Sequence, residues 1–233
     1  MTISGAPVLL LGGAGLPAWI WDATREALAP AHETVVASRP HGRTPSLADY
    51  VDAALASAPW DRFAVVAHSS GGVVGSELAR RAPDRVSVLV GVCAVVPAAG
   101  GSFVSSMPFP QRHLLSLAMR VAGTRPPDGA IRRGVAAGLD DATAERIVSE
   151  FVPESPALYR DRVGTAPLRL PVGYVTTTQD RELSPALQRR LADNLGTPRQ
   201  RSLATGHLPM LEDATELANA VTALLDERRS QLS

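Results

Sequence analysis

Two adjacent serines occur where an apolar run meets a run of small residues, in the stretch FAVVAHSSGGVVG. A strand that turns at once into a helix strains the residue at its apex, and small residues two positions away on either side relieve the crowding. Ser69 at the apex would have Ala67 and Gly71 as these neighbours, whereas Ser70 would have the larger His68 on one side. We therefore expect Ser69 to be an exposed nucleophile.

A serine hydroxyl is a poor nucleophile, so it needs a general base and the base needs a group that orients it. Of the five histidines, His207 lies in SLATGHLPMLED, in a loop after the last expected strand. Asp180 follows the preceding expected strand within its first turn. Alternatively, Asp180 and Glu182 could each be a surface acid at the start of a helix. We predict that His207 is the base and Asp180 its orienting partner.

Backbone N–H groups near Ser69 could stabilise negative charge on a reacting oxygen. The N–H of Ser70 opens the next helix, where the positive end of the helix dipole favours an anion. A second donor is expected from the glycine-rich loop GGAGLPAWIW. We choose the N–H of Ala14, with Gly13 as the neighbouring possibility and a simple glycine turn as the alternative.

The elements that must position these groups alternate between short apolar runs and helical patterns. The expected strands span residues 7–11, 33–37, 63–67, 86–96, 172–177 and 199–203. The expected helices span residues 19–28, 46–58, 72–81, 184–194 and 211–228. This alternation predicts a parallel sheet covered on both faces. Ligands in such open sheets bind at the carboxyl ends of the strands, which is where the candidate residues fall.

Residues 98–168 interrupt the alternation with prolines, glycines and several helical patterns, but with no clear strand. We expect a helical cap over the carboxyl edge of the sheet, inserted into a core made of residues 1–97 and 169–233. Apolar side chains in nearby loops and in the cap predict an apolar substrate pocket. Its candidate walls are Leu16, Trp19, Phe103, Met107, Phe109, Leu183 and Leu208.

Composition narrows the classes of partner and location. The 23 basic residues, all Arg, balance 23 acidic ones, so neither a nucleic acid nor a membrane partner is expected. The single cysteine, Cys93, cannot form an internal disulfide, and no cluster of metal ligands is evident, so we expect no metal or other cofactor. We find no apolar run of about 18 residues and no signal-type segment, which favours a cytoplasmic location. The oligomeric state is left open.

The chain resembles the α/β-hydrolase superfamily over nearly its whole length, and most of all the small esterase group of plant methylesterases and hydroxynitrile lyases. The matching segments are GGAGLPAWIWD, AHSSGG, VPAAGGSF, TTTQDRELSPALQRRLA and TGHLPMLED. The order Ser69, Asp180, His207 is the order of the superfamily's triad. The resemblance implies a three-layer fold of about six mostly parallel strands with a small helical cap. This chain departs from the family pattern at Gly12, where the family usually has His.

We therefore expect a serine hydrolase that cleaves a small, largely apolar ester, lactone or thioester through an acyl-enzyme intermediate. Alternatives are a C–C bond hydrolase, acyltransferase or cyclase that uses the same triad, or a non-catalytic ligand-binding homologue. The plant lyases have a lysine after the catalytic histidine. Leu208 stands there in this chain, which disfavours cyanohydrin cleavage. Epoxide hydrolases and dehalogenases of this fold have aspartate at the apex, so Ser69 disfavours both.

Overall fold

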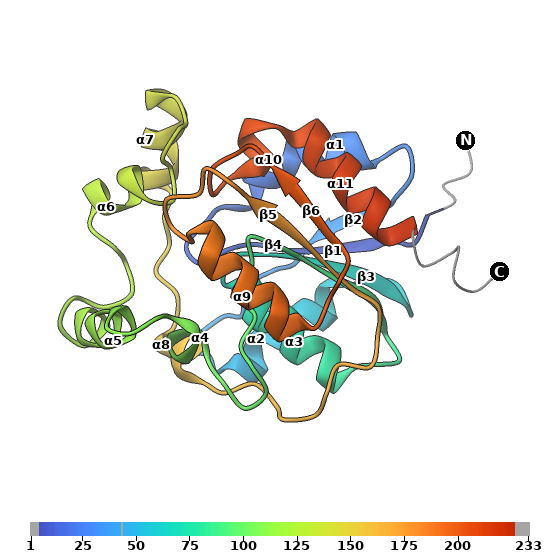
Figure 1. Ribbon diagram of the computed structural model, residues 1–233, viewed down its shortest axis with the longest axis horizontal. Coiled ribbons are helices and arrows are strands. Elements are labelled where there is room, and N and C mark those ends of the chain that lie inside the picture. Colours follow the sequence, from blue (N-terminus) through green and yellow to red (C-terminus); the bar gives the residue numbers. More distant parts are fainter. Residues whose placement is uncertain (1–4, 43, 227–233) are drawn as a thin grey trace.

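The computed structural model describes residues 5–42 and 44–226, which build a six-stranded sheet with helices on both faces (Figure 1). All strand pairs are parallel, and the order is β2-β1-β3-β4-β5-β6. The strands are β1 (Val8–Leu11), β2 (Thr34–Val36), β3 (Phe63–His68), β4 (Val86–Val92), β5 (Val172–Thr177) and β6 (Gln200–Leu203). The predicted fold class is confirmed.

Two sets of helices cover the sheet. One face carries α2 (Leu47–Ser57), α3 (Gly71–Arg81) and α9 (Pro185–Leu195). The other carries α1 (Asp22–Leu28), α10 (Pro209–Glu212) and α11 (Ala214–Asp226), with the short 3-10 helix η1 (Ala18–Trp21) leading into α1. Among the residues that the structure describes, none of the helices combines the length and the apolarity needed to cross a membrane.

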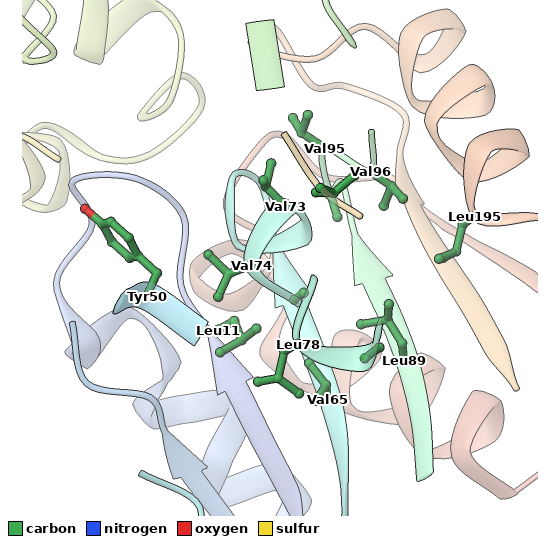
Figure 2. Packing of buried hydrophobic residues seen from close by; sticks show 14 of the residues in the cluster. Leu11, Tyr50, Val65, Val73, Val74, Leu78, Leu89, Val95, Val96 and Leu195 are labelled. Carbon is green, nitrogen blue, oxygen red and sulfur yellow. The ribbon is translucent and has the colours of Figure 1, made fainter. Parts of the chain in front are cut away.

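Alternate residues of a strand point to opposite faces of the sheet and belong to two separate hydrophobic cores. On β1, Leu9 and Leu11 enter the core beneath α2, α3 and α9, while Val8 and Leu10 enter the opposite core. Figure 2 shows the first core, where Leu11 faces helix residues such as Leu78. Because side chains of a strand alternate between faces, a sheet that is buried on both faces needs the continuous apolar runs seen in the sequence.

Two predicted boundaries were wrong. The fourth strand ends at Val92 rather than at residue 96, because Cys93 takes a left-handed backbone conformation with φ 34°. The expected closing helix 211–228 is broken, since Asp213 accepts a hydrogen bond from the N–H of Glu216 and starts a second helix. Residues 227 and 228 of that prediction lie outside the described residues.

The chain between β4 and β5 is helical. It contains α4 (Phe103–Ser106), α5 (Gln111–Ala122), α6 (Asp128–Arg133), α7 (Asp141–Ser149) and α8 (Pro156–Arg160). Figure 1 shows α5, α6 and α7 on the left of the molecule, on the side opposite the two termini. Helix α8 returns to the core and contacts α2. This segment therefore stands beside the end of the sheet at which the candidate residues gather.

Candidate active site

Ser69 occupies the sharp turn between β3 and α3. Its backbone has φ 52°, a left-handed conformation that non-glycine residues rarely adopt. The space around the turn is minimal. A Cβ atom on Gly71 would lie 2.8 Å from the carbonyl oxygen of Leu11, and one on Gly72 would lie 2.6 Å from that of Val95. The strained turn thus depends on two glycines that let α3 start directly against the sheet.

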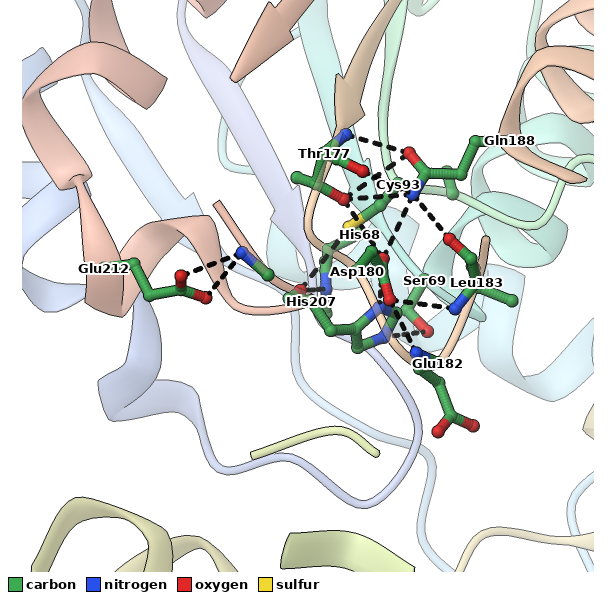
Figure 3. A network of polar contacts seen from close by, with 12 residues as sticks. His68, Ser69, Cys93, Thr177, Asp180, Glu182, Leu183, Gln188, His207 and Glu212 are labelled. Carbon is green, nitrogen blue, oxygen red and sulfur yellow. Dashed lines mark hydrogen bonds and ion pairs between the residues drawn. The ribbon is translucent and has the colours of Figure 1, made fainter. Parts of the chain in front are cut away.

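His207 lies within hydrogen-bonding distance of both Ser69 and Asp180 (Figure 3). The Nε2 atom of His207 is 3.1 Å from the Ser69 Oγ atom, and its Nδ1 atom is 2.8 Å from the Asp180 Oδ2 atom. Both His207 and Asp180 are buried. In this geometry, Nδ1 donates to the carboxylate and leaves Nε2 free to accept the serine proton, which is the arrangement that activates a hydroxyl nucleophile.

The Asp180 carboxylate is held by several donors. Its Oδ1 atom accepts the backbone N–H groups of Glu182 and Leu183, both at 2.8 Å. Its Oδ2 atom accepts Nε2 of Gln188 at 3.2 Å and the hydroxyl of Thr177 at 3.1 Å. The Glu182 side chain points away from this network (Figure 3). The support from Gln188 was not predicted, because it comes from helix α9, eight residues after Asp180.

The ionic states of the pair follow from this geometry. Burial acts to raise the pKa of Asp180, but hydrogen bonds and the charge of His207 bring it below its ordinary value. For His207, burial acts to lower the pKa, but contacts with Cys93 and Asp180 raise it well above its ordinary value. Burial raises the pKa of the Cys93 thiol, so near pH 7 the thiol is neutral and the carboxylate is the partner that favours imidazolium.

His68 lies beneath the base. Its Nε2 atom is 2.8 Å from the His207 carbonyl oxygen, and the two rings are 4.9 Å apart. Burial and the neighbouring His207 lower the pKa of His68 to about 3. The ring is therefore neutral, and because a carbonyl can only accept, Nε2 carries the proton. His68 therefore holds the loop of His207 through this hydrogen bond.

His68, Cys93 and His207 also bring ligand-type atoms within 4.8 Å of one another. Metal ligation needs a deprotonated thiol and a free ring nitrogen. Here the thiol has a raised pKa, and both nitrogens of His207 face Ser69 and Asp180. The cluster is suited to hydrogen bonding around the base rather than to holding an ion.

Two backbone N–H groups adjoin the serine. Ala14 and Ser70 line the same cavity as Ser69 and His207. Among the described residues, neither N–H has an acceptor. The loop runs directly against the nucleophile, since a Cβ atom on Gly13 would lie 2.9 Å from the Ser69 Cβ atom. Both N–H groups are therefore unpaired within the described part of the chain and belong to residues that border the cavity above Ser69.

The cavity above Ser69 has a volume of about 220 Å³ and mostly apolar walls. Four of the predicted wall residues line it, namely Leu16, Phe103, Met107 and Leu183. Further walls that the sequence reasoning missed include Gln111, Leu115, Ala118 and Met119 from α5, and Val135, Phe151 and Tyr159 from later in the same segment. The 3.6-residue periodicity of residues 111–119 is a signal that could have identified the wall from α5.

The other three predicted wall residues lie elsewhere. Trp19 is stacked against the Arg146 side chain and donates its Nε1 hydrogen to Glu150 at 2.7 Å. Phe109 is 74% exposed. Leu208 is fully buried in the core beneath α10 and α11. The position of a loop residue in the sequence did not reveal which way its side chain points.

Solved structures of low sequence identity share this fold. An extracellular alpha/beta-hydrolase from a Paenibacillus species has a TM-score of 0.80 at 19% identity, covering 94% of this chain and 98% of that one. A pyrethroid hydrolase from Sphingobium faniae JZ-2 has a TM-score of 0.72 at 21% identity, covering 95% and 97%. The enol-lactonase from Burkholderia xenovorans LB400 has a TM-score of 0.70 at 20% identity, covering 95% and 92%.

Sequence comparison points to the same family. Two rice proteins, each described as "Probable esterase PIR7A" and found in Oryza sativa subsp. indica and subsp. japonica, are 33% identical over 113 residues. The match covers 43% of this chain and 43% of each relative, which is less than half of their length. A family model described as "Alpha/beta hydrolase family" matches residues 8–220. The chain therefore belongs to the alpha/beta hydrolase family.

Proposed function

We propose that this chain is a serine hydrolase that cleaves small, largely apolar carboxylic esters, with lactones and thioesters in the same chemical class. The observation that carries the proposal is the hydrogen-bonded series from Ser69 through His207 to Asp180, with distances of 3.1 and 2.8 Å. The descriptions of the rice relatives as esterases and of one structural neighbour as an enol-lactonase support this class of reaction.

In the proposed mechanism, the Ser69 hydroxyl attacks the substrate carbonyl carbon while Nε2 of His207 takes its proton. The N–H groups of Ala14 and Ser70 hold the resulting oxyanion, and each such donor lowers the barrier by roughly 3–4 kcal/mol. His207 then protonates the leaving alcohol as the acyl-enzyme forms. A water molecule that His207 deprotonates attacks the acyl carbon. The bond from that carbon to the Ser69 oxygen then breaks as His207 returns the proton to this oxygen, and the carboxylic acid leaves.

The size and the lining of the cavity support this substrate class. About 220 Å³ of largely apolar space accommodates a small neutral acyl or alcohol group better than a charged polymer. We propose that residues 98–168 act as the cap that provides much of this space, because α5 contributes Leu115 and Met119 to the walls. The cap would then select substrates by chain length and shape.

A panel of p-nitrophenyl esters of graded acyl length, run beside simple lactones, tests the proposal. We expect turnover by the native chain, and a loss of roughly 10⁶-fold in kcat for Ser69→Ala with the fold retained. Products should be the free acid and p-nitrophenol, with solvent oxygen in the acid. Substantial activity in Ser69→Ala would refute the proposal. An acyl-transfer product in place of the free acid would show that the reaction is acyl transfer and not hydrolysis.

A further inference from the structure

The loop that carries Ala14 is held by side chains from two distant segments. Arg39, in the turn after β2, donates from one guanidinium nitrogen to the carbonyl oxygen of Gly13 at 3.0 Å and to that of Leu16 at 2.7 Å. These two carbonyls flank Ala14 in the chain. The guanidinium therefore fixes the backbone on both sides of the proposed oxyanion donor, as a planar multi-donor group can.

Glu154, from the segment between α7 and α8, holds the same loop from the other direction. Its Oε1 atom lies 2.6 Å from the Nε atom of Arg39 and accepts the backbone N–H of Gly15 at 3.2 Å. Its Oε2 atom accepts the Tyr50 hydroxyl at 2.7 Å. The Glu154 side chain is only 5% exposed, so Arg39 is the cation that compensates its buried charge.

Packing leaves the loop little freedom between these contacts. Gly15 has φ +76°, and a Cβ atom there would overlap the Phe151 ring at 2.1 Å. The N–H of Val152 donates to the Gly15 carbonyl oxygen at 3.0 Å. The backbone polar groups of residues 13, 15 and 16 are thus engaged with Arg39 and with residues 152 and 154, while the Ala14 N–H stays free.

We propose that Arg39 and Glu154 form a positioning pair, which holds the Ala14 N–H in place to bind the oxyanion. Because Glu154 belongs to the cap segment, residues 98–168, the oxyanion site depends on the packing of this segment against the core. This inference rests on the proposed serine hydrolase function. Neither Arg39 nor Glu154 lines the cavity above Ser69. Both line a neighbouring cavity of about 460 Å³, which Leu16 and Ser70 also border. In this proposal the pair acts on the transition state through the loop, and an effect on kcat without an effect on KM distinguishes that role from substrate contact. Substitution of a residue in such a role should lower kcat and leave KM nearly unchanged.

The test uses Arg39→Met and Glu154→Gln, assayed on the best p-nitrophenyl ester. We expect kcat to fall roughly 10- to 100-fold, part of the 10²–10³-fold cost of losing a whole oxyanion donor, with KM within about threefold. Affinity for a matched trifluoromethyl ketone, which forms a tetrahedral adduct, should fall by the same factor as kcat/KM. Arg39→Lys keeps the positive charge but loses the planar guanidinium with its several donors. Its kcat should therefore lie between those of the native chain and Arg39→Met.

Arg132→Met is the matched control, because Arg132 forms an exposed ion pair with Glu145 within the same helical segment. It should leave kcat and inhibitor affinity unchanged. The double variant Arg39→Met/Glu154→Gln removes both charges and leaves no unpaired buried ion, so it guards against a single variant that does not fold. We expect it to fold and to keep the kcat defect.

Native kcat and native ketone affinity in the folded double variant would overturn the inference. So would a rise in KM that accounts for the whole loss in kcat/KM. The proposed function fails separately, through an active Ser69→Ala protein. If Ser69→Ala is inactive while the Arg39 and Glu154 variants keep full kcat and ketone affinity, only the positioning role is wrong.

Discussion

Five hydrogen-bond donors surround the buried carboxylate of Asp180, one from His207 and four from residues 177, 182, 183 and 188. A buried carboxylate without such donors would take up a proton, because burial alone raises its pKa. The donors keep it ionised, so it can orient the imidazole and stabilise its protonated form. Hydrogen bonding at one residue thus sets the base strength of another.

The pH dependence of catalysis should reveal this coupling. Only neutral His207 can accept the serine proton, and its pKa lies well above 6.5 in the free protein. We predict that kcat/KM falls as pH decreases through this raised pKa, so that the acid limb lies above pH 6.5. A profile of kcat/KM against pH from 5 to 9, on a non-ionising ester, measures the position of this limb. Constant activity down to pH 5 would contradict the prediction.

Asp180→Asn should change both the level and the position of this limb. Removing the carboxylate removes its favourable interaction with imidazolium, so the pKa of His207 should decrease and the acid limb should move to lower pH. The plateau of kcat/KM should fall by about 10⁴-fold, because the amide favours the wrong tautomer. An unchanged midpoint in the same profile would show that the pKa of His207 is not set by Asp180.

Gln188 is a buried residue whose loss should reach the triad through Asp180 and Thr177. Its amide donates to the carbonyl oxygens of Thr177 and Leu183 and accepts the Thr177 N–H at 3.0 Å. Gln188→Leu leaves several of these groups unsatisfied, so we predict a loss of about 2–4 kcal/mol in the free energy of unfolding. Urea denaturation measures it. The exposed Gln179→Leu is the control and should change stability by no more than about 0.5 kcal/mol.

At the scale of elements, the junction of β3 with α3 leaves no room for an added methyl group. A methyl group on Gly72 would meet the Val95 backbone at 2.6 Å, and backbone cannot move aside cheaply. We predict that Gly72→Ala lowers the free energy of unfolding by about 1–3 kcal/mol through overpacking. Gly129→Ala in α6 is the matched control, since its methyl meets only the end of the Arg133 side chain. It should be neutral or stabilising by up to about 1 kcal/mol.

Element boundaries show what sequence periodicity can predict. Apolar runs predict the four inner strands β1, β3, β4 and β5, because strands buried on both faces must be apolar throughout. The edge strand β6 has the sequence QRSL with three exposed residues, so its apolar signal is weaker. The early end of β4 could not be predicted, since the left-handed turn at Cys93 interrupts a run that stays apolar to residue 96. Likewise, the break at Asp213 lies inside a continuous helical pattern and depends on a cap that only the fold reveals.

The same limit applies to the site. Ser69, Asp180 and His207 could be selected from sequence because each follows a strand, and parallel strands end at one edge. Gln188, Arg39 and Glu154 could not, because their roles depend on contacts between segments distant in sequence. The wall predictions for Trp19, Phe109 and Leu208 failed for a related reason, since side-chain direction in a loop follows from tertiary packing.

At the scale of the whole molecule, a sheet between two hydrophobic cores carries the proposed catalytic groups, and the helical segment between β4 and β5 lines much of the cavity. Helix α5 has Met119 on its inner side, lining the cavity, and Leu117 on its outer side, 59% exposed. We predict that Met119→Ala enlarges the cavity and raises the ratio of kcat/KM for long over short acyl esters by roughly tenfold. Leu117→Ala, on the same helix, should leave the ratio unchanged. An unchanged ratio in Met119→Ala would show that α5 does not select chain length.

The most direct test is covalent labelling with a fluorophosphonate probe, followed by peptide mass mapping. The activated hydroxyl should attack phosphorus and displace fluoride, giving one adduct per chain, located on Ser69. Labelling should slow by at least roughly 10³-fold in His207→Ala, where the serine has lost its base. No adduct on the folded native chain, an adduct on another residue, or equally fast labelling in His207→Ala would contradict the account.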